Sequence, residues 1–205
     1  MHFLLGVNAC TADAGVRGAA STPYPVLLVT LTGMTVLLGY DPETLRERVD
    51  LLEVGHRLDE LGEMRSRDAL CERAWLLKVA GRTDEALDLA NTALRLARFT
   101  GERSDVMHPR ILRATVLQAA ERYDEALTEL TACADEARTQ DWAVHEATAL
   151  LNRGKVLFDL GRDAEALSAL KAALRIVEDG DAPDDRTESI QFAIAVVQER
   201  IAAQQ

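Results

Sequence analysis

The sequence is short of the residues on which most catalytic and metal-binding sites depend. It has three cysteines, Cys10, Cys71 and Cys133, and no Cys-x-x-Cys pair, so neither a disulfide framework nor a thiolate metal site is expected. Its four histidines form no i, i+4 pair and have no carboxylate at metal-ligand spacing, and no glycine-rich phosphate loop is present. We therefore predict no catalytic residue, no metal and no cofactor, and expect a non-enzymatic protein in a reducing, cytoplasmic compartment.

Positive charge and aromatic side chains are also scarce. The chain has 34 acidic residues against 23 basic ones, a net charge of −11, and aromatic residues make up only 4% of it. The negative charge repels phosphate-rich partners, so nucleic acid is not an expected partner. Only three bases are lysines, a bias that GC-rich coding produces and that favours a bacterial source. With 48% hydrophobic residues, the chain can form one small domain packed by Ala and Leu.

Residues 1–40 lack charge almost entirely, with Asp13 and Arg17 as the exceptions. The apolar part, Val26–Gly39, is shorter than the ~20 residues of a membrane-spanning helix and is interrupted by threonines, which argues against a membrane span. Two interpretations remain. Either Pro25–Leu38 is a first helix, or the natural protein begins at Met34 and the residues before it are an extension with no fold.

Three stretches of the chain superimpose at a shift of 40 residues. Each contains an Arg, a small residue and a Leu, followed by a second Arg and the triplet Glu-Ala-Leu: Ala69–Leu87, Pro109–Leu127 and Ala149–Leu167. A repeat of this length marks units that cannot bury their own apolar faces and must stack on one another. The sequence therefore predicts an elongated binding surface rather than a closed pocket.

After each triplet the apolar residues follow a helical period. Their places in the three units are all apolar: Ala86, Leu87, Ala90, Ala93, Leu94 and Ala97; Ala126, Leu127, Leu130, Cys133, Ala134 and Ala137; Ala166, Leu167, Leu170, Ala173, Leu174 and Val177. Such a stripe lies along one face of a helix, so each unit should end in an amphipathic helix. Because Cys133 takes a place held elsewhere by alanine, it is predicted to be a buried core thiol.

The turn inside each unit is marked by glycine. Gly81 and Gly161 stand where the first helix should end, and glycine adopts the left-handed conformation there without steric cost. The middle unit has Glu121 in this place. Before the middle unit, Pro109 should lie in the first turn of its helix, with His108 or Asp105 as the cap.

These residues resemble the tetratricopeptide repeat family, whose pattern W-x2-L-G-x2-Y, A-x3-F and P runs over two antiparallel helices. The small residues match best, at the pairs Ala74/Ala86, Ala114/Ala126 and Gly154/Ala166. The aromatic positions are mostly replaced by Leu or Ala, the Pro is absent, and each unit is longer than the usual ~34 residues, as in extended bacterial-type repeats. Over about residues 65–178, the resemblance implies an all-α, right-handed α-solenoid of stacked antiparallel helix pairs.

Outside the three units, the domain organisation follows from weaker signals. Residues 1–24 are expected to be a disordered or mis-assigned extension, and residues 25–64 a degenerate first repeat. The second helix of that repeat would begin at Pro42, with Asp41 as its cap, and run to about Leu61. Residues 65–205 hold the repeats and, after an acidic loop at 179–185, a capping helix with the apolar stripe Ile190, Ala193, Ile194, Val197 and Ile201.

The resemblance also implies which residues would line a concave groove. In such domains the first helix of each unit faces the groove, which gives the candidate contacts Trp75, Lys78, Ile111, Gln118, Asn152, Lys155 and Phe158. Two of the three lysines are in this set, so a carboxylate on an extended peptide is a candidate guest. Trp75 could be an interface anchor or could instead pack between units.

The function expected is that of a protein- or peptide-binding scaffold or adaptor, and a homodimer is one form that such binding can take. The alternative is a regulatory sensor module that binds a small ligand or signalling peptide, as in bacterial transcription regulators.

The recurring Arg73, Arg113 and Arg153 stand where the family usually has Leu. We interpret them either as a ladder that reaches acids on the preceding helix pair or as a row that binds ligand.

Overall fold

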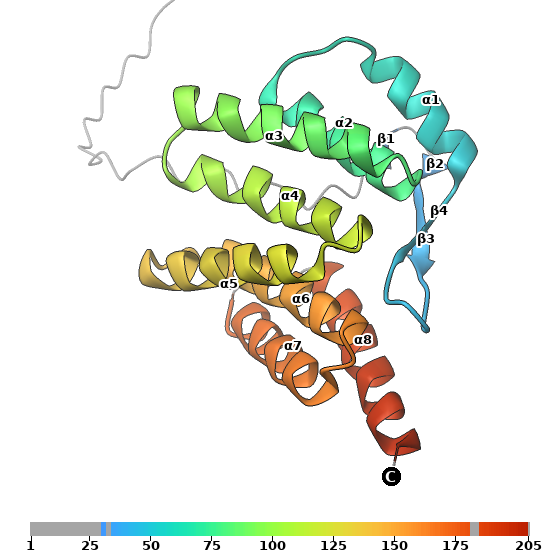
Figure 1. The fold of residues 1–205 in the computed structure, drawn as a ribbon, viewed down its shortest axis with the longest axis vertical. Helices are drawn as coiled ribbons and strands as arrows, with labels where there is room; N and C mark the ends of the chain where they lie inside the picture. The colour runs from blue at the N-terminus through green and yellow to red at the C-terminus, as the bar shows by residue number, and fades with distance from the viewer. Residues whose placement is uncertain (1–29, 32–33, 181–184, 205) are drawn as a thin grey trace, which may run out of the picture.

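The computed structural model describes residues 30–31, 34–180 and 185–204, and within them the fold is a stack of helices preceded by a β-hairpin (Figure 1). Three helix pairs form the stack: α2 (Arg67–Val79) with α3 (Thr83–Thr100), α4 (Met107–Ala119) with α5 (Tyr123–Thr139), and α6 (Ala143–Asp159) with α7 (Asp163–Glu178). Before them lies α1 (Leu51–Leu61), and after them α8 (Asp185–Ala203). The predicted all-α solenoid is confirmed.

Small side chains allow the two helices of each pair to approach closely. Ala74, Ala86, Ala114, Ala126 and Ala166 are fully buried. At Gly154 a Cβ atom would lie 2.7 Å from Cγ of Leu170, a distance that side chains do not tolerate without moving. The core is therefore built from close backbone approach rather than from large side chains.

The predicted apolar stripes face this core. Most of their members are buried, and the remainder, such as Leu87, Leu127 and Leu167, are partly buried against it. Cys133 is fully buried, as predicted.

The turns between paired helices share one geometry. Gly81, Glu121 and Gly161 have φ of 78°, 59° and 69°, which confirms the left-handed conformation at the predicted glycine places. The residue that follows each of them donates a backbone hydrogen bond of 2.9 Å to a carbonyl near the end of the first helix; for Arg82 the acceptor is Leu77. Glu121 is therefore a non-glycine residue in a conformation that glycine adopts at lower cost.

The repeated Arg and Glu of each turn form a local ion pair. Arg82 with Glu85, Arg122 with Glu125 and Arg162 with Glu165 each make two hydrogen bonds of 2.7 to 2.8 Å across the start of the second helix. All six side chains are about half exposed. The motif orients the helix start, and because each pair is exposed to solvent it contributes little to stability.

The start of the middle unit was predicted in part. Pro109 does lie in the first turn of α4, where its missing N–H costs no helical bond. The predicted cap was wrong, because a short 3-10 helix, Ser104–Val106, runs directly into α4 and no side chain caps it. Asp105 instead accepts a hydrogen bond from the backbone N–H of Glu102.

The last helix closes the stack, as predicted. Ile190, Ala193 and Val197 of α8 are buried against the helices before it. Arg200 donates to the carbonyl oxygen of Phe158 at 2.6 Å and pairs with the buried carboxylate of Asp163.

The predicted helices before residue 50 were wrong. In place of a helix from Pro42, and over the described part of Pro25–Leu38, the chain forms short strands: β1 (Thr30–Leu31) with β2 (Met34–Thr35), and β3 (Leu37–Tyr40) with β4 (Glu47–Val49). Helix α1 begins only at Leu51, and its cap is Asp50, whose carboxylate accepts from the N–H groups of Leu52 and Glu53. The predicted extension 1–24 and most of the acidic loop lie outside the described residues.

Asp41 organises a turn between β3 and β4 rather than a helix. Its carboxylate accepts hydrogen bonds of 2.9 Å from the backbone N–H groups of Glu43 and Thr44. An Asp side chain bonded to the backbone in this way, followed by a proline, favours a turn. Pro42 therefore lies in the hairpin loop and does not begin a helix.

Replacing Glu121 with glycine should stabilise the protein. The left-handed backbone at this exposed position costs glycine less than it costs glutamate, so we expect Glu121→Gly to raise the free energy of unfolding by about 1 kcal/mol. Chemical denaturation measures the change. The reverse substitution Gly161→Glu is the matched control and should lower stability by a similar amount; a loss of stability in Glu121→Gly would contradict the argument.

Candidate functional site

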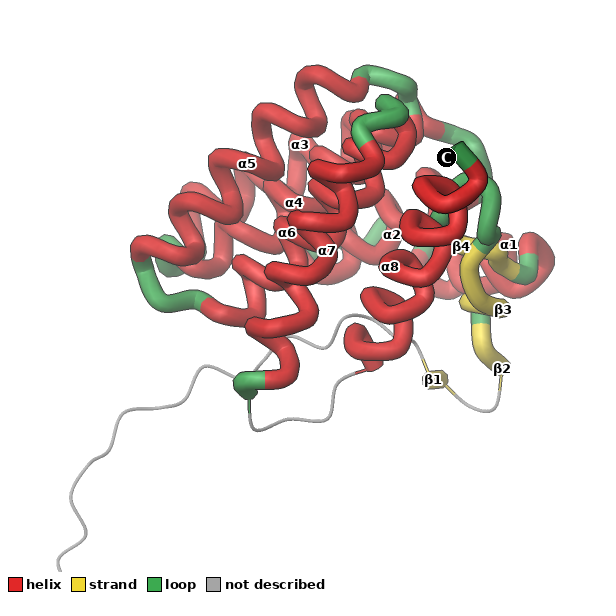
Figure 2. Tube along the Cα trace, turned by 90° about the horizontal axis from the view of Figure 1, so that it is seen from below, coloured by secondary structure: helices red, strands yellow, loops and turns green. Residues whose placement is uncertain are grey.

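The inner face of the stack is defined here as the side of α2, α4 and α6 that carries Lys78, Gln118 and Lys155. The β3–β4 hairpin covers it, and residues 40–47 are called the hairpin tip below. Figure 2 shows the hairpin next to α8, on the side of the stack away from α5. The tip thus lies over part of the predicted groove, next to Lys78, Gln118, Asn152 and Lys155.

Most of the predicted groove residues are buried. Lys78, Ile111, Gln118, Lys155 and Phe158 are each less than 9% exposed, while Trp75 and Asn152 are partly buried. Buried lysines are rare unless paired, so the partners of Lys78 and Lys155 identify the chemistry of this face.

Glu47 of the hairpin tip supplies the carboxylate that the two lysines require. The Lys78 ammonium lies 3.0 Å from Oε1 of Glu47. Burial favours the protonated form of Glu47, but the charges of Lys78 and Lys155 outweigh this effect and lower the pKa of its carboxyl to about 2. Lys78 therefore binds the Glu47 carboxylate directly, and Lys155 of another repeat adds a second positive charge nearby.

Lys155 is held against an aromatic ring as well. Its ammonium lies 4.7 Å from the centroid of the Tyr40 ring, within the range of a cation–π contact, and the Tyr40 ring lies 6.1 Å from that of Phe192 in α8. Burial lowers the pKa of Lys155, although the nearby Glu47 opposes the shift. The tip thus contacts both the repeats and the capping helix.

An acidic position lies beside the lysines. Asp159, at the end of α6, is 3.7 Å from the Arg46 guanidinium and accepts a hydrogen bond of 2.8 Å from the Gln118 side chain. Burial raises the pKa of Asp159, although the bond from Gln118 and the charge of Arg46 oppose this. The face can therefore bind a basic and an acidic side chain next to each other.

Leu45 places an apolar side chain at the same point. It is 1% exposed and joins the core cluster formed by α4 to α8. Its φ of 56° lies in the left-handed region, which bulky residues rarely adopt. The contacts of the tip therefore hold Leu45 in a strained backbone conformation.

The remaining predicted contacts are engaged within the fold. Trp75 packs between two core clusters, with the Lys78 ammonium 6.0 Å from its ring, and Ile111 belongs to the main core. Phe158 lies under the Arg200 guanidinium at 3.2 Å, and the amide of Asn152 donates to the carbonyl oxygen of Thr148 at 2.8 Å.

A cavity of about 360 Å³ remains between the tip and the helices. Its lining comes from the tip and from three repeats and combines polar with apolar groups: Leu45, Arg46, Glu47, Lys78, Val79, Gly81, Thr83, Thr115, Gln118, Ala119, Asn152 and Lys155. The tip therefore covers the inner face but leaves an open space between itself and the helices.

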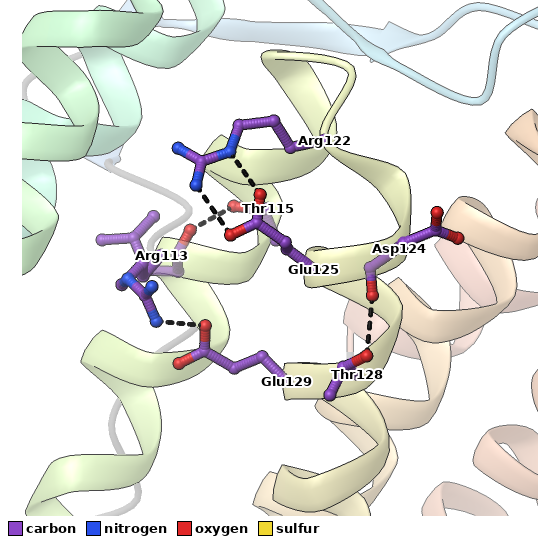
Figure 3. A network of polar contacts seen from close by, with 8 residues as sticks. Arg113, Thr115, Arg122, Asp124, Glu125, Thr128 and Glu129 are labelled. Atoms are coloured by element: carbon purple, nitrogen blue, oxygen red, sulfur yellow. Dashed lines mark hydrogen bonds and ion pairs between the residues drawn. The ribbon is translucent and has the colours of Figure 1, made fainter.

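The row of recurring arginines is not uniform in its contacts. Arg113 pairs with Glu129 of α5, inside its own helix pair, so the predicted partner on the preceding pair was wrong (Figure 3). The places that correspond to Glu129 in the other units are Leu89 and Ala169. A ladder that repeats along the stack through this position is therefore excluded.

The described residues offer little for catalysis. Burial raises the pKa of the Cys71 thiol to about 12 and that of Cys133 to about 11, so both stay protonated at neutral pH. Burial lowers the pKa of His108 to about 4. In the part of the chain that the structure describes, no group of three His, Cys, Asp or Glu side chains could hold a metal ion, and no helix has the length and apolar character needed to cross a membrane.

Comparison with known proteins agrees with the helix pairs. Residues 107–179, which form α4 to α7, match the family model described as tetratricopeptide repeat. The solved structure titled "Crystal Structure of the Apo Form of RapI" superimposes with a TM-score of 0.57 at 17% identity, over 75% of this chain and 56% of that one. This chain thus spans little more than half the length of RapI, and the likeness concerns the fold. No curated protein sequence matches.

Removing the charge of Glu47 should make the fold less sensitive to acid. The pKa of about 2 in the folded state lies below the ordinary 4.5, so the ionised carboxylate stabilises the fold above pH 4.5, and this contribution is lost as the pH falls towards 2. Denaturation at pH 7, 4.5 and 3 should show a steeper loss of stability in the wild type than in Glu47→Gln. The exposed Glu63→Gln is the control; equal losses in wild type and Glu47→Gln would refute the assignment.

Charge reversal at Arg113 should destabilise the middle unit. Arg113→Glu places two partly buried carboxylates together, and we expect the free energy of unfolding to fall by about 1–2 kcal/mol. The exchange Arg113→Glu with Glu129→Arg should restore most of the loss, because the pair is re-formed with opposite polarity. Thermal unfolding measures both, and failure of the exchange to restore any stability would mean that the ion pair is not the cause.

Proposed function

We propose that this chain, which contains tetratricopeptide repeats, is a non-enzymatic scaffold that binds a protein or an extended peptide across its inner face. One observation carries the proposal: the face already holds a segment of polypeptide, the turn at its own hairpin tip, through a carboxylate that pairs with Lys78 near Lys155. A surface that binds one such segment has the chemistry to bind another.

The arrangement of charges supports a peptide that bears a carboxylate. Lys78 and Lys155 come from different repeats, so a segment that reaches both must run across the stack. Charge-assisted hydrogen bonds of this kind are strong and directional, and they select an acidic side chain or a carboxyl terminus. The negative net charge of the chain makes these two buried lysines a local exception, which adds to the selectivity.

A second candidate is a sensor for a small acidic ligand. The cavity of about 360 Å³ favours it, because ligand sites commonly measure ~300–1,000 Å³. In that case a small molecule would bind beside the tip and change its position.

Selection from a random peptide library against the full chain tests the scaffold. We expect enrichment of peptides with an acidic residue, and an affinity reduced at least about tenfold by Lys155→Met or Lys78→Met, since each removes one charge of the carboxylate site. Lys171→Met is the matched control, because Lys171 is the third lysine and is exposed on α7. Isothermal titration calorimetry measures the affinities.

Two results would count against the scaffold. Binding that both lysine variants leave unchanged would place the peptide elsewhere on the molecule. An absence of enriched peptides, together with a small carboxylate that raises the melting temperature of the wild type but not of Lys155→Met, would favour the sensor.

A further inference from the structure

The described contacts between the hairpin tip and the helices are made by side chains. Over the described residues, β3 and β4 pair only with each other, and no further strand extends their sheet. An isolated two-stranded hairpin is marginally stable in water. The order of the tip therefore depends on its contacts with the inner face.

Three consecutive residues of the tip make these contacts, and each meets different chemistry. Leu45 enters the apolar core, Arg46 lies 3.7 Å from Asp159, and Glu47 lies 3.0 Å from Lys78. The inner face thus recognises an apolar, a basic and an acidic side chain in succession. The helices that supply these groups, α2 and α6, belong to different repeats.

The fit of the tip is imperfect in ways that favour exchange. Leu45 is held in a left-handed conformation that suits glycine, and the adjoining cavity is left open. The Glu47 side chain is still 22% exposed although its partner Lys78 is buried, so water reaches one side of this ion pair. A segment with the same charges and without the backbone strain would bind more favourably.

We propose that residues 40–47 are a built-in competitor for the inner face, and that the partner which replaces them presents an apolar, a basic and an acidic side chain in the order of Leu45-Arg46-Glu47. This inference rests on the proposed function, since it assumes that the inner face is the binding site. When a partner displaces it, the tip becomes disordered. The apparent affinity for the partner is reduced in proportion to the fraction of molecules in which the tip is undocked.

A labelled peptide spanning residues 36–50 serves as the probe. Its affinity is measured by fluorescence anisotropy for the full chain as wild type, Glu47→Gln, Leu45→Ser and the double variant Glu47→Gln with Lys155→Met. Trypsin cleavage after Arg46 reports release of the tip, and circular dichroism checks that the helices persist. If the tip is docked for more than ~90% of the time, its release should tighten peptide binding at least about tenfold.

The expected result is faster cleavage and tighter peptide binding in Glu47→Gln and Leu45→Ser, with the gain in affinity lost in the double variant. Unchanged cleavage in both single variants overturns the inference, because the tip is then held by neither its charge nor its apolar side chain. Equal affinity of wild type and released variants for the probe also overturns it.

The two proposals can fail separately. If library-selected peptides bind wild type and Glu47→Gln equally and need Lys155, the scaffold stands and the competition by the tip is refuted. If no peptide binds the wild type or the released variants, the scaffold itself is refuted.

Discussion

The close approach of paired helices is the constraint on which the rest of this structure depends. Ala74, Ala114 and Gly154 let the first helix of each pair lie against the second with almost no side chain between them, so the repeats stack with a regular spacing. That regularity places Lys78 and Lys155 on one side of the stack although they are 77 residues apart in sequence. The carboxylate site is therefore a product of the packing of small residues elsewhere.

The repeats could be predicted because their sequence signals are local and occur in three successive units. A 40-residue shift, an apolar stripe and a glycine turn each indicate the same helix pair, and the left-handed backbone at Glu121 shows that the shift holds even where the residue type departs. The burial of Lys78, Gln118 and Lys155 could not be predicted, because it results from a segment that is not a repeat. No periodicity connects Glu47 to Lys78.

The hairpin was not predicted, because a weak likeness to the repeat turns indicated a helix pair where the residue types favour strands and a turn. Leu38-Gly39 and the Asp that follows resemble the turn at Leu160-Gly161, which suggested another helix pair. Yet Val36 and Val49 favour strands, and the run from Asp41 to Thr44 has a side-chain acceptor followed by a proline, the composition of a turn. The strand and turn propensities of these residues indicate the hairpin better than their likeness to the repeats does. Its docking position on the helices is seen only in the folded structure.

Covering the inner face with charged groups has a consequence for selectivity. An apolar cover of the same size would bind more firmly, because buried ion pairs contribute little once desolvation is counted. An apolar cover would also leave no charge pattern on the inner face by which one segment could be distinguished from another. A cover held by Glu47 against two lysines and by Arg46 against Asp159 leaves behind a defined pattern of charge when it is displaced. A segment that lacks that pattern would leave buried charges unpaired, and under the proposed competition this penalty, rather than the strength of any contact, would make the face selective.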